Sequence, residues 1–386
     1  MTPEEGLRLL ARGTLRSVAR EAWESALARV NPEVAVAESL SLEGNRLSAG
    51  PVELADVRQI VVLGFGKAGV AMLRGAMAAL PGRIRGGLVV VKDGHADGQT
   101  RIGPVRIAEA GHPVPDERSV RLAGDMLDLA RSVAPDELAL VLGSGGGSSL
   151  IASPVEGIEL ADLVEVTNAL LRSGADIREM NAVRRHLSAA HGGRLAAAFR
   201  CRSLSLLVSD VVGDDLPSIA SGPTVPDPTT WAEAADILKQ RLGRRIPARV
   251  SRLLKAHDPA ETPKAATLDW GRHPVVVVAS AVSAVDAALD AFRKRGFKVE
   301  GLGAGVTGDV ADVAASLVSR ALAAPRSTRP QAIVAGGETT VTVSGPGVGG
   351  RNQHLAALAA RRLDAERAEG ALEDREIVVV SLATEN

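Results

Sequence analysis

The stretch Gln59–Leu80, QIVVLGFGKAGVAMLRGAMAAL, decides the fold. An apolar strand at Gln59–Leu63 is followed by the loop Gly64–Gly69, and the segment Val70–Leu80 is suited to a helix. The G-x-G-x-x-G spacing between a strand and a helix lets the backbone approach a phosphate group, and the helix N-terminus favours its charge. The pattern predicts a ligand-binding loop, although a tight turn without a ligand is the alternative. Its candidate cofactor-binding residues are Gly64, Gly66 and Gly69.

Further apolar runs extend this unit into a sheet. They lie at Gly87–Val91, Glu137–Leu142, Leu204–Ser209, Pro274–Ala279, Gln331–Ala335 and Glu376–Leu382. Most are continuous Val, Ile and Leu runs, which are typical of parallel strands buried on both faces. Helical segments separate them, among them Leu160–Ser173 and helices opening at Thr230 and Asp309. We predict an α/β protein with a Rossmann-like, mainly parallel sheet in a larger N-terminal domain and a smaller C-terminal α/β domain.

The length of 386 residues favours two domains. The stretch 242–272 changes character, because it gathers Arg and Pro residues and loses its periodicity. We therefore predict an N-terminal domain at 1–241, a linker at 242–272 and a C-terminal domain at 273–386.

Composition excludes several classes of protein. The 45 basic residues balance 46 acidic ones, so no net field attracts nucleic acid or an anionic membrane. A single cysteine, Cys201, rules out a disulfide framework or a multi-cysteine metal site within one chain. The N-terminus lacks a secretory signal pattern, and the apolar runs are too short to span a bilayer. A cytoplasmic protein is expected.

A second glycine loop follows the strand Glu137–Leu142. Consecutive glycines directly after a buried strand form a nest of N–H groups that binds anions, whereas flexible linkers seldom occupy this position. The loop supplies the candidate cofactor-binding residues Ser144, Gly145, Gly146, Gly147, Ser148 and Ser149.

Lys67 lies inside the first glycine loop of a chain that has few lysines. An ammonium group there is suited to the transfer of phosphoryl groups. Asp93, which follows the strand Gly87–Val91, stands near the position of a ribose-binding acid, so a nicotinamide or flavin enzyme is the alternative.

Two more polar loops follow predicted strands. Asp210 and Asp214 are candidate Mg²⁺ ligands, with helix capping and turn formation as an equal alternative. Glu338 is a candidate cofactor-binding residue, and a glycine-rich stretch leads to Arg351 and Asn352 at the start of an expected helix. Arg351 is well placed to bind a carboxylate or phosphate, whereas a hairpin over Thr339–Ser344 is the plainer reading of this region.

The segment around His186 supplies the candidate substrate-binding residues Asn181, Arg184 and His186, together with Asn352 from the later loop. Adjacent arginines also suit a solvent-facing surface, and both readings remain open. His112 lies in the stretch Gly111–Pro115, GHPVP, and bracing that turn is its expected role.

These segments together resemble the glycerate kinases of the glycerate 2-kinase type, in which a Rossmann-like domain precedes a MOFRL domain. The matching stretches are GFGKAG (Gly64–Gly69), GHPVPDERS (Gly111–Ser119), LGSGGGSSLIASP (Leu142–Pro154), NAVRRHLSAAHGGRLA (Asn181–Ala196), LLVSDVVGDDLPSIASGPTVPDPTT (Leu206–Thr230) and GGETTVTVSGPGVGGRNQHLA (Gly336–Ala356). They run through most of the chain in one order, so the resemblance is specific.

The resemblance implies an enzyme that uses ATP and Mg²⁺ to phosphorylate the 2-hydroxyl of D-glycerate, which gives 2-phosphoglycerate. It implies that Lys67 and Arg351 form the charged catalytic pair, and that Gly143–Ser149 holds the ATP phosphates. The expected partner is this small-molecule substrate, with no nucleic acid and no membrane, and a homodimer is left open. The family usually continues with a glycine- and aspartate-rich stretch, which the printed sequence, ending at Asn386, does not contain.

The rival from another reaction class is an NAD(P)-dependent hydroxypyruvate reductase, and a non-catalytic sugar- or nucleotide-binding sensor is a third reading. Lys67, the second glycine loop and the stretch Gly349–Gln353 favour the kinase, because hydride transfer requires none of them.

Overall fold

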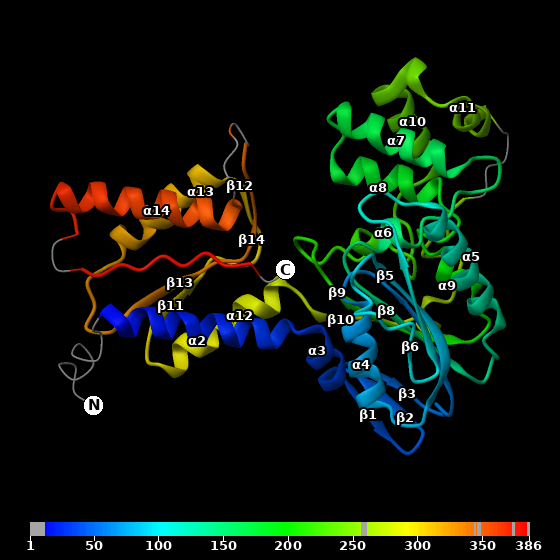
Figure 1. The fold of residues 1–386 in the computed structure, drawn as a ribbon, viewed down its shortest axis with the longest axis horizontal. Coiled ribbons are helices and arrows are strands. Elements are labelled where there is room, and N and C mark those ends of the chain that lie inside the picture. The colour runs from blue at the N-terminus through cyan, green and yellow to red at the C-terminus, as the bar shows by residue number, and fades with distance from the viewer. Residues whose placement is uncertain (1–11, 256–260, 343–344, 346–348, 373–374, 384–386) are drawn as a thin grey trace. The chain divides into compact units, whose positions relative to one another are not determined.

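A computed structural model describes residues 12–255, 261–342, 345, 349–372 and 375–383 (Figure 1). The chain forms two compact units. The larger comprises Pro32–Val278, and the smaller combines Met1–Asn31 with Ala279–Asn386.

A seven-stranded sheet forms the centre of the larger unit, in the order β10-β9-β8-β4-β5-β7-β6. Its strands are β4 (Ile60–Phe65), β5 (Ile84–Lys92), β6 (Arg101–Ile102), β7 (Val105–Ala110), β8 (Leu138–Gly143), β9 (Arg202–Val208) and β10 (Val275–Ala279). The pairs β4–β5, β4–β8, β5–β7 and β8–β9 are parallel, and β6–β7 is antiparallel. The predicted Rossmann-like, mainly parallel sheet is confirmed.

The chain reverses its direction across the sheet between β4 and β8. From β4 it proceeds to β5 and β7 on one side, and it then returns to β8 and β9 on the other. In open α/β sheets, ligands bind at the carboxyl ends of the strands where this reversal occurs. Gly64–Gly69 and Gly143–Ser149 follow these two strands, so both loops lie at that edge of the sheet.

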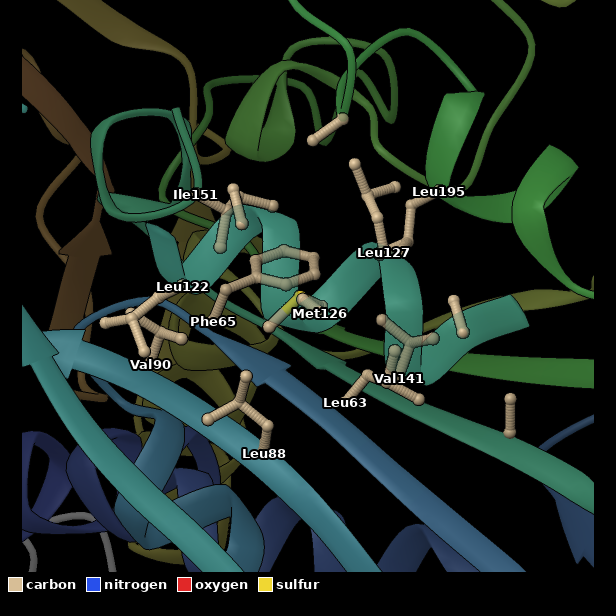
Figure 2. Close-up of a cluster of buried hydrophobic side chains, with 14 of the residues drawn as sticks. Leu63, Phe65, Leu88, Val90, Leu122, Met126, Leu127, Val141, Ile151 and Leu195 are labelled. Atoms are coloured by element: carbon tan, nitrogen blue, oxygen red, sulfur yellow. The ribbon is translucent and has the colours of Figure 1, made fainter. Parts of the chain in front are cut away.

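Apolar packing fixes the two central strands. All residues of β4 and of β8 are buried. On one face, Leu63 and Phe65 of β4 and Val141 of β8 pack in a cluster with the helix α5 (Glu117–Ser132) (Figure 2). The short helices α6 (Gly147–Leu150) and α9 (Arg194–Ala198) contribute Leu150 and Leu195 to the same cluster. The strand ends that carry the glycine loops are therefore held by a dry core.

Four helices form a second core within the larger unit (Figure 1). They are α7 (Leu160–Arg172), α8 (Ile177–His186), α10 (Trp231–Leu242) and α11 (Ala248–Lys255). The predicted linker at 242–272 differs from the structure, because it contains α11 and two short 3₁₀ turns, Gly243–Arg245 and Trp270–Arg272. Val250 is fully buried in this second core, so α11 belongs to the larger unit, which extends to Val278.

Several short elements of the larger unit escaped prediction. The strands β1 (Leu40–Glu43), β2 (Arg46–Ala49) and β3 (Val52–Leu54) form a separate antiparallel sheet. The helix α3 (Pro32–Ser39) packs on α4 (Gly69–Ala79). Strands of three or four residues carry too few side chains for an alternating pattern to be recognised.

The smaller unit is also α/β. The helices α2 (Arg12–Val30) and α12 (Ala281–Lys294) pack together, as do α13 (Val310–Ala323) and α14 (Arg351–Ala368). Two parallel strand pairs accompany them, β11 (Lys298–Gly301) with β13 (Gln331–Val334) and β12 (Val306–Asp309) with β14 (Gly337–Thr340).

One strand prediction for this unit is wrong. The described residues of Glu376–Leu382 form no strand, and Ile377 and Val379 instead pack beside α13 and α14. The strand β14 pairs in parallel with β12. The hairpin alternative over Thr339–Ser344 stays open, because residues 343–344, and 346–348 beyond them, lie outside the described residues.

No helix among the described residues combines the length and the apolar composition that crossing a bilayer requires.

Two helical glycines provide a matched test of the packing between α3 and α4. A methyl group on Gly75 of α4 would collide with the Glu33 carbonyl oxygen of α3, whereas one on Gly124 of α5 would meet nothing within 4 Å. We expect Gly75→Ala to lower the free energy of unfolding by about 1–3 kcal/mol. Gly124→Ala should raise it by up to about 1 kcal/mol, since alanine is the better helix former. Urea unfolding checks both, and equal effects would contradict the packing described.

Candidate active site

The two glycine loops interlock through their backbones. The Lys67 amide donates to the Gly145 carbonyl at 2.9 Å, and the Ser144 amide donates to the Phe65 carbonyl at 3.0 Å. The Ser144 hydroxyl in turn accepts from the Ala68 amide at 3.0 Å. These three bonds join the ends of β4 and β8 into one rigid surface.

The glycines of the first loop serve close packing. A methyl group on Gly66, whose φ is +116°, would collide with the Ser144 hydroxyl and lie 2.5 Å from the Ser144 carbonyl oxygen. Methyl groups on Gly64 and Gly69 would each lie 2.8 Å from a methyl of Val89 on β5. The structure therefore gives all three glycines a steric reason of their own.

The amides of the first loop are also engaged inside the protein. Besides Lys67 and Ala68, the Gly66 amide donates to the Val90 carbonyl at 3.1 Å, and the Gly69 amide donates to the Gly66 carbonyl at 3.1 Å. A phosphate group would find these donors already occupied. The predicted nucleotide role of Gly64, Gly66 and Gly69 stays a prediction, but their amides do not support it.

The second loop differs in this respect. The amides of Gly145, Gly146 and Ser148 donate to no described residue. The amides of Gly147 and Ser149 donate within the turn, to Ser144 and Gly146 carbonyls. Open N–H groups close together in a loop with a left-handed glycine, here Gly146 at φ +86°, form an anion-binding nest. The sequence predicts amide donors for a phosphate in both glycine loops, and the structure leaves such amides open in the second loop.

Side chains that follow three strands of the sheet, β4, β7 and β9, lie against this nest. Lys67 follows β4, His112 follows β7 and Asp210 follows β9. A methyl group on Gly146 would lie 3.0 Å from His112 Nε2 and 3.4 Å from Lys67 Cγ. A methyl group on Gly145 would collide with the Asp210 carboxylate. Two cationic or basic groups and one acid thus lie against the nest.

A left-handed turn closes the far side of the second loop. Ala220, Ser221 and Gly222 have φ values of +49°, +59° and +60°. Two of these residues carry a Cβ, and left-handed backbone at such residues stores strain that often accompanies function. The buried Ser221 hydroxyl lies 2.8 Å from the Ser148 hydroxyl, which fixes the start of α6. Nothing in the sequence signalled this turn.

The predicted substrate-binding residues Asn181, Arg184 and His186 all lie on α8, and their surroundings differ. His186 is fully enclosed, with Nδ1 2.8 Å from the Ala182 carbonyl and Nε2 2.8 Å from Glu261, so it has a structural role. Asn181 is buried at 3% exposure. Arg184 is half-buried, forms no ion pair with a described residue, and burial lowers its pKa. Of the three, Arg184 is the group that an anion would satisfy best.

Arg185, by contrast, has its own partner, since its Nε lies 2.8 Å from the buried Asp227 carboxylate.

His191 follows α8 and is buried at 2% exposure. Its Nδ1 is 2.7 Å from the Ser188 hydroxyl, and its Nε2 is buried without a hydrogen-bond partner among the described residues. Burial, reinforced by the nearby arginines, lowers the pKa of His191 to about 3, so the ring stays neutral.

The remaining predicted residues belong to the smaller unit. Arg351 is the first residue of α14, and its Nη1 lies 2.6 Å from Glu338 Oε1 on β14. Asn352 accepts a hydrogen bond from the Ser381 hydroxyl at 2.9 Å. The pair Arg351 and Glu338 is about half-exposed on both sides, at 51% and 57%. Glu338 and Arg351, which the sequence separates by 12 intervening residues, are brought together.

Asp93, the acid considered for ribose binding, is occupied. Arg118 donates to both of its carboxylate oxygens, at 2.7 and 2.8 Å. These hydrogen bonds lower the pKa of Asp93. A ribose hydroxyl would have to displace Arg118 to reach it.

The acids predicted to bind a metal do not form a complete site. Asp210 is exposed, Asp214 has a left-handed backbone with φ +53°, and Asp215 accepts from the Ser218 hydroxyl at 2.5 Å. The described part of the chain contains no group of three or more His, Cys, Asp or Glu side chains able to hold a metal ion.

Comparison with known families matches both parts of the chain. A domain of unknown function, DUF4147, matches residues 18–255. The MOFRL family matches residues 331–385. The first match alone spans more than half of the chain.

Similar proteins carry two different names. A D-glycerate 2-kinase of Thermotoga maritima is 34% identical over 356 residues, which are 91% of this chain and 80% of that protein. A putative hydroxypyruvate reductase of Agrobacterium vitis is 39% identical over 344 residues, 87% of this chain and 74% of that protein. The crystal structure of a glycerate kinase from Thermotoga maritima has a TM-score of 0.79 and 33% identity, and covers 94% of this chain and 81% of its own.

The buried His191 makes stability depend on pH. Its pKa falls from an ordinary 6.5 to about 3 in the folded protein, so between these values the unfolded chain binds a proton that the folded chain does not. The free energy of unfolding should therefore decrease as the pH falls below about 6.5, by up to about 1.4 kcal/mol per pH unit from this group.

We expect His191→Asn to reduce that slope, since the amide keeps a polar contact near Ser188 but does not titrate. Urea unfolding at pH 8, 6 and 5 measures it, above the range in which Glu261, whose pKa is lowered to about 2, takes up its proton. Parallel pH curves for the two proteins would refute the assignment.

Proposed function

We propose that this chain, which belongs to the glycerate kinase family with DUF4147 and MOFRL domains, transfers the γ-phosphoryl group of ATP to the 2-hydroxyl of D-glycerate. The product is 2-phosphoglycerate, and the reaction is that of the glycerate 2-kinases it resembles at 33–34% identity. A cytoplasmic location, where ATP is available, belongs to the same proposal.

The observation that carries the proposal is the nest at Gly145–Ser148. Its three open amides lie at the reversal between β4 and β8, where α/β sheets bind their ligands. Phosphate oxygens accept hydrogen bonds from such amides without needing a basic side chain for each bond. We infer that the β- and γ-phosphates of ATP bind there.

Lys67 is proposed to stabilise the transferring phosphoryl group. Phosphoryl transfer needs positioning and charge stabilisation more than covalent chemistry. The backbone of Lys67 is fixed by its bond to Gly145, and its side chain passes beside Gly146. Both contacts support a position next to the nest. Arg351, whose guanidinium is oriented by Glu338, is proposed as the second cation of the reaction.

The acceptor is proposed to bind through Arg184. A half-buried guanidinium that pairs with no carboxylate of the described residues gains most from an anionic ligand, and D-glycerate carries one carboxylate. Asn181 and Asn352 stay candidates for its hydroxyl groups.

Mg²⁺ is proposed to arrive on the nucleotide, where phosphate oxygens supply most of its ligands. The metal roles of Asp210 and Asp214 stay predictions.

The reductase name of one relative is a second candidate, and Asp93 argues against it. Nicotinamide cofactors are held through their ribose by an acid at the end of the second strand. Here that acid is bound on both oxygens by Arg118. A hydride-transfer site also gives no role to Lys67 beside a phosphate nest.

One pair of assays separates the two reactions. The protein is incubated with D-glycerate and Mg-ATP, and separately with hydroxypyruvate and NADH. We expect 2-phosphoglycerate in the first, identified against the 3-phospho isomer by ³¹P NMR, and no loss of NADH absorbance in the second. NADH oxidation without phosphate transfer would overturn the proposal.

Lys67→Ala should lower kcat by about 10²–10³-fold, with a smaller change in KM for D-glycerate, because its charge is needed mainly in the transition state. The control is Lys239→Ala, which removes an exposed lysine paired with Asp236 on α10 and should leave kcat unchanged. Steady-state kinetics measure both, and a wild-type kcat for Lys67→Ala would remove this residue from the mechanism.

A further inference from the structure

His112 lies at the site without a structural partner of its own. Its ring packs against Gly146, and no described residue forms a hydrogen bond with either ring nitrogen. The other histidines that the structure describes in the larger unit are His95, His186, His191 and His273. Each is engaged through Nδ1, with the Lys67 carbonyl at 3.2 Å, the Ala182 carbonyl, the Ser188 hydroxyl and the Ser203 hydroxyl, respectively. The ring of His112 is therefore available to a ligand.

The surroundings of His112 favour its neutral form. Partial burial is the main cause that lowers its pKa, and the nearby side chains of Lys67, Lys92 and His95 act in the same direction. Asp210 opposes them with a smaller effect. A neutral imidazole beside a phosphate nest has a lone pair to accept a proton, which a protonated ring lacks.

Two residues beside the nest are able to serve as the base, and their surroundings differ. Asp210 is exposed and lies against Gly145, open to solvent. His112 lies against Gly146, the glycine that the Lys67 side chain also borders. A base must reach the hydroxyl that attacks the phosphorus, and Lys67 is proposed to stabilise the phosphoryl group that contains it. His112 and Lys67 both border Gly146, whereas Asp210 borders Gly145.

We propose that His112 is the general base of the kinase reaction, which rests on the proposed function. The O–H bond of the 2-hydroxyl breaks and its proton moves to a ring nitrogen of His112. The hydroxyl oxygen forms a bond to the γ-phosphorus, and the bond from that phosphorus to the β-phosphate bridging oxygen breaks, with its electron pair leaving on ADP. The imidazolium then loses its proton to solvent.

The test compares pH–rate profiles of the wild type, His112→Gln, Asp210→Asn and the control His354→Gln, which replaces an exposed histidine of α14. We expect kcat of the wild type to fall with decreasing pH as His112 takes up a proton. His112→Gln should lose about 10²–10⁴-fold in kcat, keep KM for ATP within about threefold, and lose this acid limb. His354→Gln should match the wild type.

If His112 has only a structural role, His112→Gln should show a reduced kcat that still falls with decreasing pH as the kcat of the wild type does. That pattern, or an acid limb removed by Asp210→Asn and kept in His112→Gln, overturns the proposal. His112→Ala with added imidazole gives a second reading, because only a missing base is replaced by free imidazole. Failure of both His112 variants to fold would make His112 structural and also overturn it. A wild-type protein without kinase activity contradicts the proposed function instead, so the two failures are distinguishable.

Discussion

The interlocking of two glycine loops at the ends of β4 and β8 is the constraint on which the site depends. The bonds between Lys67 and Gly145 and between Ser144 and Phe65 hold the loops at a fixed separation. The amides of Gly66, Lys67, Ala68 and Gly69 in the first loop are engaged inside the protein, whereas those of Gly145, Gly146 and Ser148 in the second loop donate to no described residue. Any side chain on Gly66 would separate the loops, since its Cβ would enter Ser144. The dry core beneath both strands supplies the rigidity that this close approach needs.

Much of the fold was predictable because its signals are local. Continuous apolar runs identified β4 and β8, and capping residues placed helix starts such as Thr230 before α10, where the hydroxyl does accept from Glu233. The stretch that contains α11 was predicted to be a linker because this short helix is rich in arginine. Val250 is its one fully buried residue among those described, and it is buried only against the neighbouring helices, which the local sequence does not reveal.

The sequence predicted which residues lie at the site, but not the role of each one. Sequence located both glycine loops and Lys67, yet it assigned phosphate binding to amides that the fold uses internally. The direction of an N–H group depends on the packing of distant segments and leaves no mark in the local sequence. The local sequence predicts only a bracing role for His112, because its contact with Gly146 joins residues 34 positions apart. His186, by contrast, has a motif context that suggested substrate binding, and burial against Glu261 gives it a structural role.

The central claim is that the amides of Gly145, Gly146 and Ser148, and not those of the first loop, receive the phosphates. Hydrogen–deuterium exchange at single-residue resolution tests it, with and without Mg²⁺ and a nonhydrolysable ATP analogue. Without nucleotide, these three amides should exchange faster than those of Lys67 and Ala68, which are already hydrogen-bonded. With nucleotide, the three should slow markedly while Lys67 and Ala68 change little. Slowing confined to Gly64–Gly69, or absent from Gly145–Ser148, would contradict the account.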